Sequence, residues 1–193
     1  GGLRGILGVG TNRMNIYVVR KSTKGFLNYM FNHYPNLKEQ GVVISYDCRH
    51  NSRRFAEEAA GIIGAMGVKV YVFSSLRATP ELSYAVRYLK AAGGIMITAS
   101  HNPPIYNGYK VYDHEGCQLI PDLADEVINE ISKIEDMFNI ETKDFNELVE
   151  EGTVKIIDKE VDEPYLEQVK TVTVNEVEKS NIKIVYTPLH GTG

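Results

Sequence analysis

The stretch Gly93–Tyr112 reads GGIMITASHNPPIYNGYKVY, and the rest of the sequence is best understood around it. Its first half, Gly94 to Ala99, is an apolar run that predicts a buried strand. Ser100, His101 and Asn102 follow, and then two prolines, which disfavour both a helix and a central strand. Asn107-Gly108 indicates a second turn before another strand. The stretch therefore predicts a stiff polar loop at the end of a strand, where functional groups are often placed.

On both sides of this stretch, segments typical of strands alternate with segments typical of helices. Strands are expected at residues 42–46, 68–73, 109–112, 118–120, 154–157 and 181–186. Helices are expected at residues 15–34, 52–66, 79–92, 121–134, 145–150 and 160–172, with the first interrupted by Gly25. The alternation predicts an α/β fold, a layered sandwich with a mixed, mostly parallel β-sheet flanked by helices. The sheet is expected to be mixed because a hairpin turn at 114–116 follows the polar loop.

The ends of the chain suggest how it is divided into domains. Residues 1–13 are rich in glycine, which favours a flexible terminal loop. The strand expected at 181–186 and the segment after it look like the opening of a further domain. We therefore expect one domain over residues 1–180 and the first strand of a second domain over residues 181–193.

Composition and charge limit the possible functions. A net charge of −4 gives no electrostatic reason to expect nucleic acid or an anionic membrane as a partner. No apolar run approaches the roughly 20 residues that span a bilayer, and the N-terminus lacks the apolar core of a signal peptide. The two cysteines, Cys48 and Cys117, belong to no CxxC motif. We read them as free thiols in a reducing compartment, and the location as cytoplasmic.

The polar loop combines groups that suit phosphoryl transfer. Ser100 offers a hydroxyl, His101 can move protons near neutral pH, and Lys110 supplies a cation. Acyl transfer is less favoured because the sequence around Ser100 lacks the GxSxG pattern of a serine hydrolase. A serine that carries a phosphoryl group fits better, because the glycine–arginine N-terminus can accept its negative charge.

Several segments together resemble the α-D-phosphohexomutases, the phosphoglucomutase/phosphomannomutase superfamily. Thr98–Pro103 (TASHNP) is similar to the phosphoserine loop of that family, and Asn107–Lys110 (NGYK) resembles the segment that follows it. Further segments also fit, and the resemblance covers essentially the whole chain: Gly1–Gly5, Ala78–Leu82 and His190–Gly193. The variant Gly8–Asn15 (GVGTNRMN) resembles the branch with certain bacterial phosphoglucomutases and phosphopentomutase-like members.

This resemblance implies an isomerase of carbohydrate metabolism that interconverts hexose 1-phosphate and hexose 6-phosphate. It implies that Ser100 is a phosphoserine whose phosphate ligates Mg²⁺, and that the phosphosugar substrate passes through a sugar bisphosphate intermediate. Ser100, His101, Lys110 and Arg4 are the implied catalytic residues. The same four and Asn102 are expected to bind the substrate or its phosphate, and Asn102 is also expected to hold the loop's shape. For Arg13, Arg49 and Arg53 we favour structural or peripheral roles.

The resemblance leaves several questions open. Phosphoglucomutase is the favoured activity, and phosphomannomutase and phosphopentomutase are the alternatives, because the loop that selects the sugar lies outside this chain. The family's aspartate-rich metal loop is also absent, so we expect the remaining domains of the same polypeptide to complete the site and this chain alone to be inactive. A non-catalytic sugar-phosphate-binding module is a reading from another class, and a serine hydrolase is a third.

Overall fold

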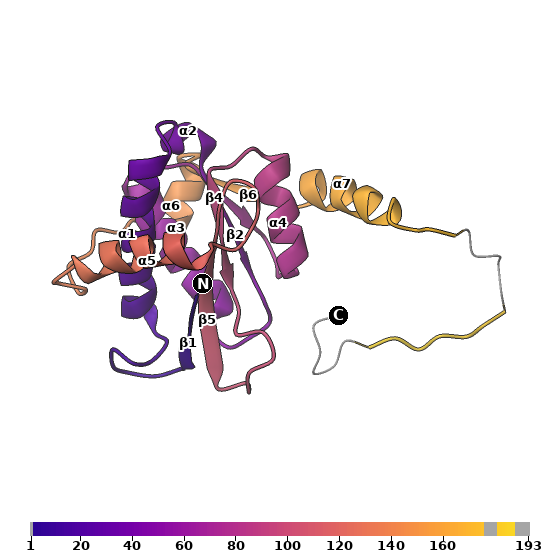
Figure 1. The fold of residues 1–193 in the computed structure, drawn as a ribbon, viewed down its shortest axis with the longest axis horizontal. Helices are drawn as coiled ribbons and strands as arrows, with labels where there is room; N and C mark the ends of the chain where they lie inside the picture. Colours follow the sequence, from indigo (N-terminus) through magenta and orange to yellow (C-terminus); the bar gives the residue numbers. More distant parts are fainter. Residues whose placement is uncertain (1, 176–180, 188–193) are drawn as a thin grey trace.

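The computed structural model describes residues 2–175 and 181–187 and contains one six-stranded sheet with helices on both faces (Figure 1). The strands are β1 (Leu3–Ile6), β2 (Val42–Tyr46), β3 (Val70–Phe73), β4 (Gly93–Ile97), β5 (Tyr106–Tyr112) and β6 (Val154–Ile157). The helices are α1 (Ile16–His33), α2 (Leu37–Gln40), α3 (Ser52–Ala65), α4 (Thr79–Tyr88), α5 (Pro121–Ser132), α6 (Phe145–Glu150) and α7 (Lys159–Lys170).

The sheet is mixed, as expected, with strand order β1-β5-β4-β2-β3-β6. The pairs β4–β2, β2–β3 and β3–β6 are parallel. The pairs β1–β5 and β5–β4 are antiparallel. The switch occurs at β4, whose carboxyl end leads directly into the serine loop, which we define as residues 98–105.

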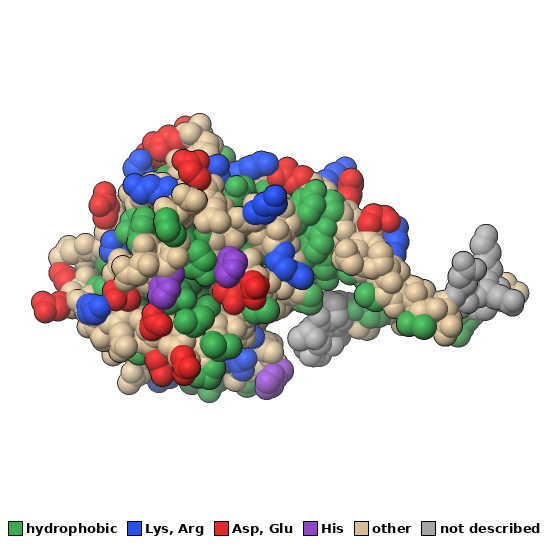
Figure 2. Space-filling model, turned by 45° about the horizontal axis from the view of Figure 1, so that its top comes forward, with side chains coloured by type: hydrophobic (Ala, Val, Ile, Leu, Met, Phe, Trp, Pro, Cys, Tyr) green, Lys and Arg blue, Asp and Glu red, His purple; other side chains and the backbone are tan. Residues whose placement is uncertain are grey.

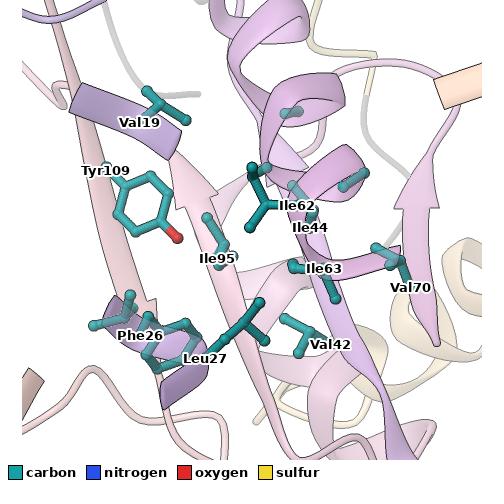
Figure 3. Close-up of a cluster of buried hydrophobic side chains, with 14 of the residues drawn as sticks. Val19, Phe26, Leu27, Val42, Ile44, Ile62, Ile63, Val70, Ile95 and Tyr109 are labelled. Atoms are coloured by element: carbon teal, nitrogen blue, oxygen red, sulfur yellow. The ribbon is translucent and has the colours of Figure 1, made fainter. Parts of the chain in front are cut away.

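Both faces of the central strands are buried, so their residues alternate between two hydrophobic layers. Val42, Ile44 and Ile95 contribute to the layer under α1 and α3. In Figure 3, side chains of these helices, among them Phe26 and Ile62, point toward the strand residues. Residues of the opposite face pack against α4 and α7: Val43, Phe73, Met96 and Ile157. The sheet is therefore a rigid platform for the loops at its edge.

Three predictions that were based on glycine-containing segments were wrong, at least in part. Asn107-Gly108 does not form a turn, because both residues lie inside β5. The N-terminal segment is not a flexible loop over its whole length, because Leu3–Ile6 forms β1 against β5. Gly25 does not interrupt α1. Local signals failed here because contacts between segments that are distant in the sequence decide these conformations.

Other boundaries shift by a few residues. The helix expected to reach residue 92 ends at Tyr88. The strand expected at residues 118–120 is reduced to a single bridge between Tyr112 and Gln118. Residues 181–187 are exposed and have no regular secondary structure, so the strand expected there is not formed. The HGTG segment lies outside the described residues, and the division into two domains stays a prediction.

The exposed side chains agree with the weak net charge. On the face drawn in Figure 2, acidic and basic side chains are interspersed without a large field of one sign. Cys48 and Cys117 are both exposed free thiols, as predicted. Among the helices of the described residues, none has the length and apolar content needed to cross a bilayer.

Candidate active site

The serine loop leaves the carboxyl end of β4 and returns at β5. Ser100 adopts a left-handed backbone conformation, with φ of 54°. Its N–H donates to Thr98 Oγ1 at 2.9 Å, and the Asn102 N–H donates to the Ala99 carbonyl at 3.1 Å. Ser100 Oγ lies 3.4 Å from Nδ1 of His101, whose side chain is exposed. The turn therefore presents the hydroxyl and the imidazole side by side at the surface.

Arg4 and Lys110 reach this region from the two antiparallel strands. Arg4 on β1 pairs in register with Gly108 on β5, and its guanidinium donates to Asn102 Oδ1 at 3.2 Å. Lys110 lies two residues farther along β5. Burial, and then the positive charge of Arg4, lowers the pKa of Lys110 from its ordinary value. The structure thus brings Arg4 and Lys110 near each other, with Arg4 bound to Asn102 of the serine loop.

These two cations have no carboxylate partner among the described residues. The salt bridges at residues 2–175 and 181–187 involve other arginines and lysines. Two neighbouring cations without a protein anion create a local positive potential, which favours a bound anion such as phosphate.

Glycine permits the close approach of strands at this point. A Cβ on Gly108 would lie 2.5 Å from the Thr98 carbonyl oxygen and 2.6 Å from that of Leu3. A Cβ on Gly2 would lie 3.1 Å from Cγ of Lys110. The glycines therefore allow β1 and the end of β4 to close on β5, which sets Arg4 and Lys110 beside the loop.

The sequence favoured a structural or peripheral role for Arg49 and a turn role for Asn107, but it did not predict the contacts through which both residues support this site. Arg49 lies in the loop after β2. Its guanidinium donates hydrogen bonds to the backbone carbonyls of Ser100 and Asn102 in the serine loop. Asn107, which was read as a turn residue, is fully buried in β5 and donates to the β2–α3 loop. A polar amide at a buried strand position is the signal that could have indicated such a role.

The other arginines behave differently from Arg49. Arg53 forms an ion pair with Glu57 one turn along the exposed face of α3, and Arg13 is exposed in the loop after β1. Within the part of the chain that the structure describes, neither side chain donates a hydrogen bond to the serine loop, in contrast to Arg4 and Arg49. The structural or peripheral role favoured for these two stays a prediction.

The described residues offer little that could hold a metal or enclose a substrate. Within residues 2–175 and 181–187, no group of three or more His, Cys, Asp or Glu side chains has the arrangement of a metal site. A hollow of about 540 Å³ lies between α3 and Thr142–Phe145, and another of about 230 Å³ lies beside Gly8. Neither is lined by Ser100, His101 or Lys110.

The fold and site define an α/β/α domain that displays a serine, beside two cations, on a turn at the end of a central strand. The family model described as phosphoglucomutase/phosphomannomutase, alpha/beta/alpha domain I, matches residues 1–137. The chain therefore belongs to the phosphoglucomutase/phosphomannomutase family.

Relatives and solved structures agree with this assignment. A phosphoglucomutase of Staphylococcus saprophyticus is 41% identical over 191 residues, which cover 99% of this chain and 34% of the relative. A phosphoglucomutase of Staphylococcus aureus is 36% identical over 193 residues, with coverage of 99% and 34%. A solved structure from Thermus thermophilus, provisionally described as a phosphomannomutase, has a TM-score of 0.71 and 28% identity. It covers 88% of this chain and 34% of that chain.

A more distant structure supports the fold alone. A phosphoglucomutase/phosphomannomutase family protein from Burkholderia thailandensis has a TM-score of 0.66 at 22% identity, covering 89% of this chain and 34% of its own. The chain thus spans about a third of the length of the curated relatives and solved structures that it matches.

Proposed function

We propose that this chain is the serine-bearing domain of an isomerase that moves a phosphoryl group between positions of a sugar phosphate. Residues 1–180 form that domain and residues 181–193 begin the next. The observation that carries the proposal is the pair of cations, Arg4 and Lys110, beside the exposed Ser100 loop without a carboxylate partner among the described residues. The names of the relatives favour glucose phosphate as substrate, with mannose and pentose phosphates as alternatives.

The proposed chemistry begins with a phosphoryl group on Ser100. The bond between Ser100 Oγ and phosphorus breaks, and a new bond forms to a hydroxyl of the bound sugar phosphate, which gives a sugar bisphosphate. The attacking hydroxyl loses its proton, and Ser100 Oγ gains one. The other phosphoryl group of the bisphosphate then returns to Ser100 in the reverse of these steps. Phosphoryl transfer of this kind depends mainly on in-line positioning and on charge stabilisation.

The side chains divide this work by their chemistry and position. Arg4 offers a planar fork of donors to the phosphoryl group in transfer. Lys110 is half-buried, and its lowered pKa makes it a better proton carrier than a solvated lysine. His101, 3.4 Å from Ser100 Oγ, is the alternative acid or base. Asn102 accepts a hydrogen bond from Arg4 and so holds the guanidinium beside the loop.

Magnesium is proposed as the cofactor, but this chain cannot supply its whole coordination. Mg²⁺ prefers six oxygen ligands, whereas the described residues contain no group of three or more His, Cys, Asp or Glu side chains that could hold a metal ion. Both carboxylate oxygens of Asp47, a nearby acid, are engaged by Arg49 and Ser52. A phosphate on Ser100 can contribute one ligand, and other domains of the same polypeptide would contribute the rest. The bound ion would neutralise charge on the phosphoryl oxygens.

A cytoplasmic location also stays a prediction.

A coupled assay of the full-length polypeptide tests the proposal. Glucose 1-phosphate, mannose 1-phosphate and ribose 1-phosphate are compared as substrates, and intact mass is measured for a phosphoserine, which adds about 80 Da. We expect turnover of at least one substrate and its loss in Ser100→Ala. Near-normal turnover by Ser100→Ala refutes the role of Ser100. An acyl adduct at Ser100 would indicate a hydrolase, and binding without turnover would indicate a non-catalytic module.

A further inference from the structure

One arginine binds several backbone carbonyls of the serine loop and of the strand that follows it. The guanidinium of Arg49 donates to the carbonyl oxygens of Ser100 at 2.7 Å and Asn102 at 2.6 Å through Nη2. Through Nη1 it donates to those of Pro103 at 2.9 Å and Tyr106 at 3.1 Å. The Arg49 side chain is only 12% exposed, so these are shielded, charge-assisted bonds. A single planar cation therefore binds three carbonyls of the serine loop and the first carbonyl of β5.

Arg49 is itself fixed in place by a second set of contacts. Asp47 Oδ2 lies 3.4 Å from Arg49 Nε, and Asp47 Oδ1 accepts from the Arg49 N–H at 3.0 Å. Ser52 Oγ donates to the same Oδ1 at 2.7 Å. The Asn107 side chain on β5 donates to Ser52 Oγ at 2.9 Å and to the His50 carbonyl at 3.0 Å. The guanidinium is thus held by Asp47 of the β2–α3 loop, which is in turn supported from α3 and β5.

These contacts determine the conformation of Ser100. Its N–H is bound to Thr98 Oγ1, and its carbonyl is bound to Arg49. With both peptide groups fixed, the unfavourable left-handed conformation of Ser100 is maintained and the direction of its Cα–Cβ bond is set. Binding to Arg49 also offsets the partial negative charge of carbonyls that would otherwise repel a nearby phosphoryl group.

We propose that Arg49 is a positioning residue for phosphoryl transfer at Ser100. It acts without touching the reacting atoms, by holding the loop so that Ser100 Oγ meets the sugar phosphate in line. The inference rests on the proposed function, in which Ser100 carries the phosphoryl group. Lysine cannot replace Arg49, because its compact ammonium has three tetrahedral donors and cannot form the planar array that binds four carbonyls.

Arg49→Lys in the full-length polypeptide is the main test, with Arg53→Lys as its control. Arg53 is an exposed arginine of the neighbouring helix, paired with Glu57. The measurements are kcat and KM for glucose 1-phosphate, phosphorylation of Ser100 by glucose 1,6-bisphosphate followed by intact mass, and Tm. We expect Arg49→Lys to lower kcat by on the order of 100-fold while KM changes less than about threefold, because misplaced reacting groups lose rate more than binding. Arg53→Lys should match the wild type.

Other results would overturn the inference. Unchanged kcat in Arg49→Lys would show that any cation suffices, and a raised KM with normal kcat would make Arg49 a substrate-binding residue. If Arg49→Lys does not fold, Ser52→Ala serves as the test of the inference, because it removes only one of the hydrogen bonds to Asp47. A fall in kcat of about fivefold or more at constant KM supports the inference, and unchanged kcat refutes it. Activity that survives Ser100→Ala would instead refute the proposed function, so the two failures are distinguishable.

Discussion

At the scale of single residues, Asn107 shows how a buried polar side chain can connect separate parts of a site. Its amide nitrogen donates to the His50 carbonyl and to Ser52 Oγ, and its amide oxygen accepts from the Gly108 N–H at 2.7 Å. Among the described residues, no buried side-chain polar atom is left without a partner. Asn107 therefore joins β5 to the loop that carries Arg49.

Replacing Asn107 with leucine should destabilise this chain by about 2–3 kcal/mol, because buried partners lose their hydrogen bonds while volume is kept. Urea denaturation monitored by circular dichroism measures the change. Asn32→Ala, at an exposed position of α1, is the control and should change stability by less than about 0.5 kcal/mol. A loss for Asn107→Leu as small as that of the control would contradict the role assigned to the amide.

The residue types along the sequence predicted the residues of the candidate site, but not the contacts that hold these residues in place. Ser100, His101 and Lys110 were predicted because their segment has a recognisable pattern and lies after an apolar strand. Asn107-Gly108 was read as a turn because this pair favours turns when local preferences act alone. Here Gly108 is needed for the close approach of two carbonyl oxygens instead. The role of Arg49 depends on loops that meet only after folding, so no local pattern could reveal it.

At the scale of elements, α1 and α5 pack so closely that one position on α1 tolerates no side chain. A Cβ on Gly25 would lie 2.3 Å from Cγ1 of Ile131 and 2.8 Å from its Cα. Glycine costs roughly 1 kcal/mol relative to alanine inside a helix. That cost is offset by the contact with α5, which explains why Gly25 does not interrupt α1.

Gly25→Ala should therefore lower the stability of this chain by about 1–3 kcal/mol, although alanine is the better helix former. The clash involves backbone atoms of Ile131, so truncation to Ile131→Ala should not restore stability in the double variant. Thermal unfolding of the two single variants and the double variant measures this. A gain in stability for Gly25→Ala would show that α5 can move away without cost.

At the scale of the whole molecule, a cluster of charges ties α7 to the sheet. Arg77, in the loop after β3, donates from Nε and Nη2 to the two carboxylate oxygens of Asp162, each at 2.8 Å, and from Nη2 to Asp158 at 3.0 Å. Glu81 on α4 shares a hydrogen bond with Asp162. Burial, and then the interaction with Asp162, raises the pKa of Glu81 to about 7.

This shift makes stability depend on pH. The ordinary pKa of a glutamate is 4.5, so between that value and about 7 the folded chain keeps a proton that the unfolded chain loses. The contribution of Glu81 is most favourable below pH 4.5 and declines as the pH rises to about 7. Arg77, Asp158, Asp162 and Tyr165 are the charged or titratable groups that act at this cluster.

Glu81→Gln should remove that dependence, because glutamine can still donate a hydrogen bond but does not ionise. We expect the variant and the wild type to have equal free energies of unfolding at about pH 5, and the variant to be the more stable protein at about pH 8. Urea unfolding of both proteins across this range provides the comparison. Parallel stability curves for the two proteins would show that Glu81 does not titrate differently on folding.

The overall fold was more predictable than the connections within it. The bounds of β2, α6 and β6 were predicted correctly from hydrophobic runs and turn residues. The alternation of strands and helices predicted a layered sheet. In contrast, β1 could not be recognised, because its four residues form a strand only by pairing with β5, about a hundred residues later.

The left-handed backbone at Ser100 has a consequence for the evolution of this position. A threonine hydroxyl carries a phosphoryl group as readily as a serine hydroxyl does. However, a β-branched side chain is strongly disfavoured at positive φ, because its second substituent crowds the backbone. In the proposed function, the backbone geometry of this position therefore favours serine over threonine as the phosphoryl carrier, although the two alcohols have similar reactivity.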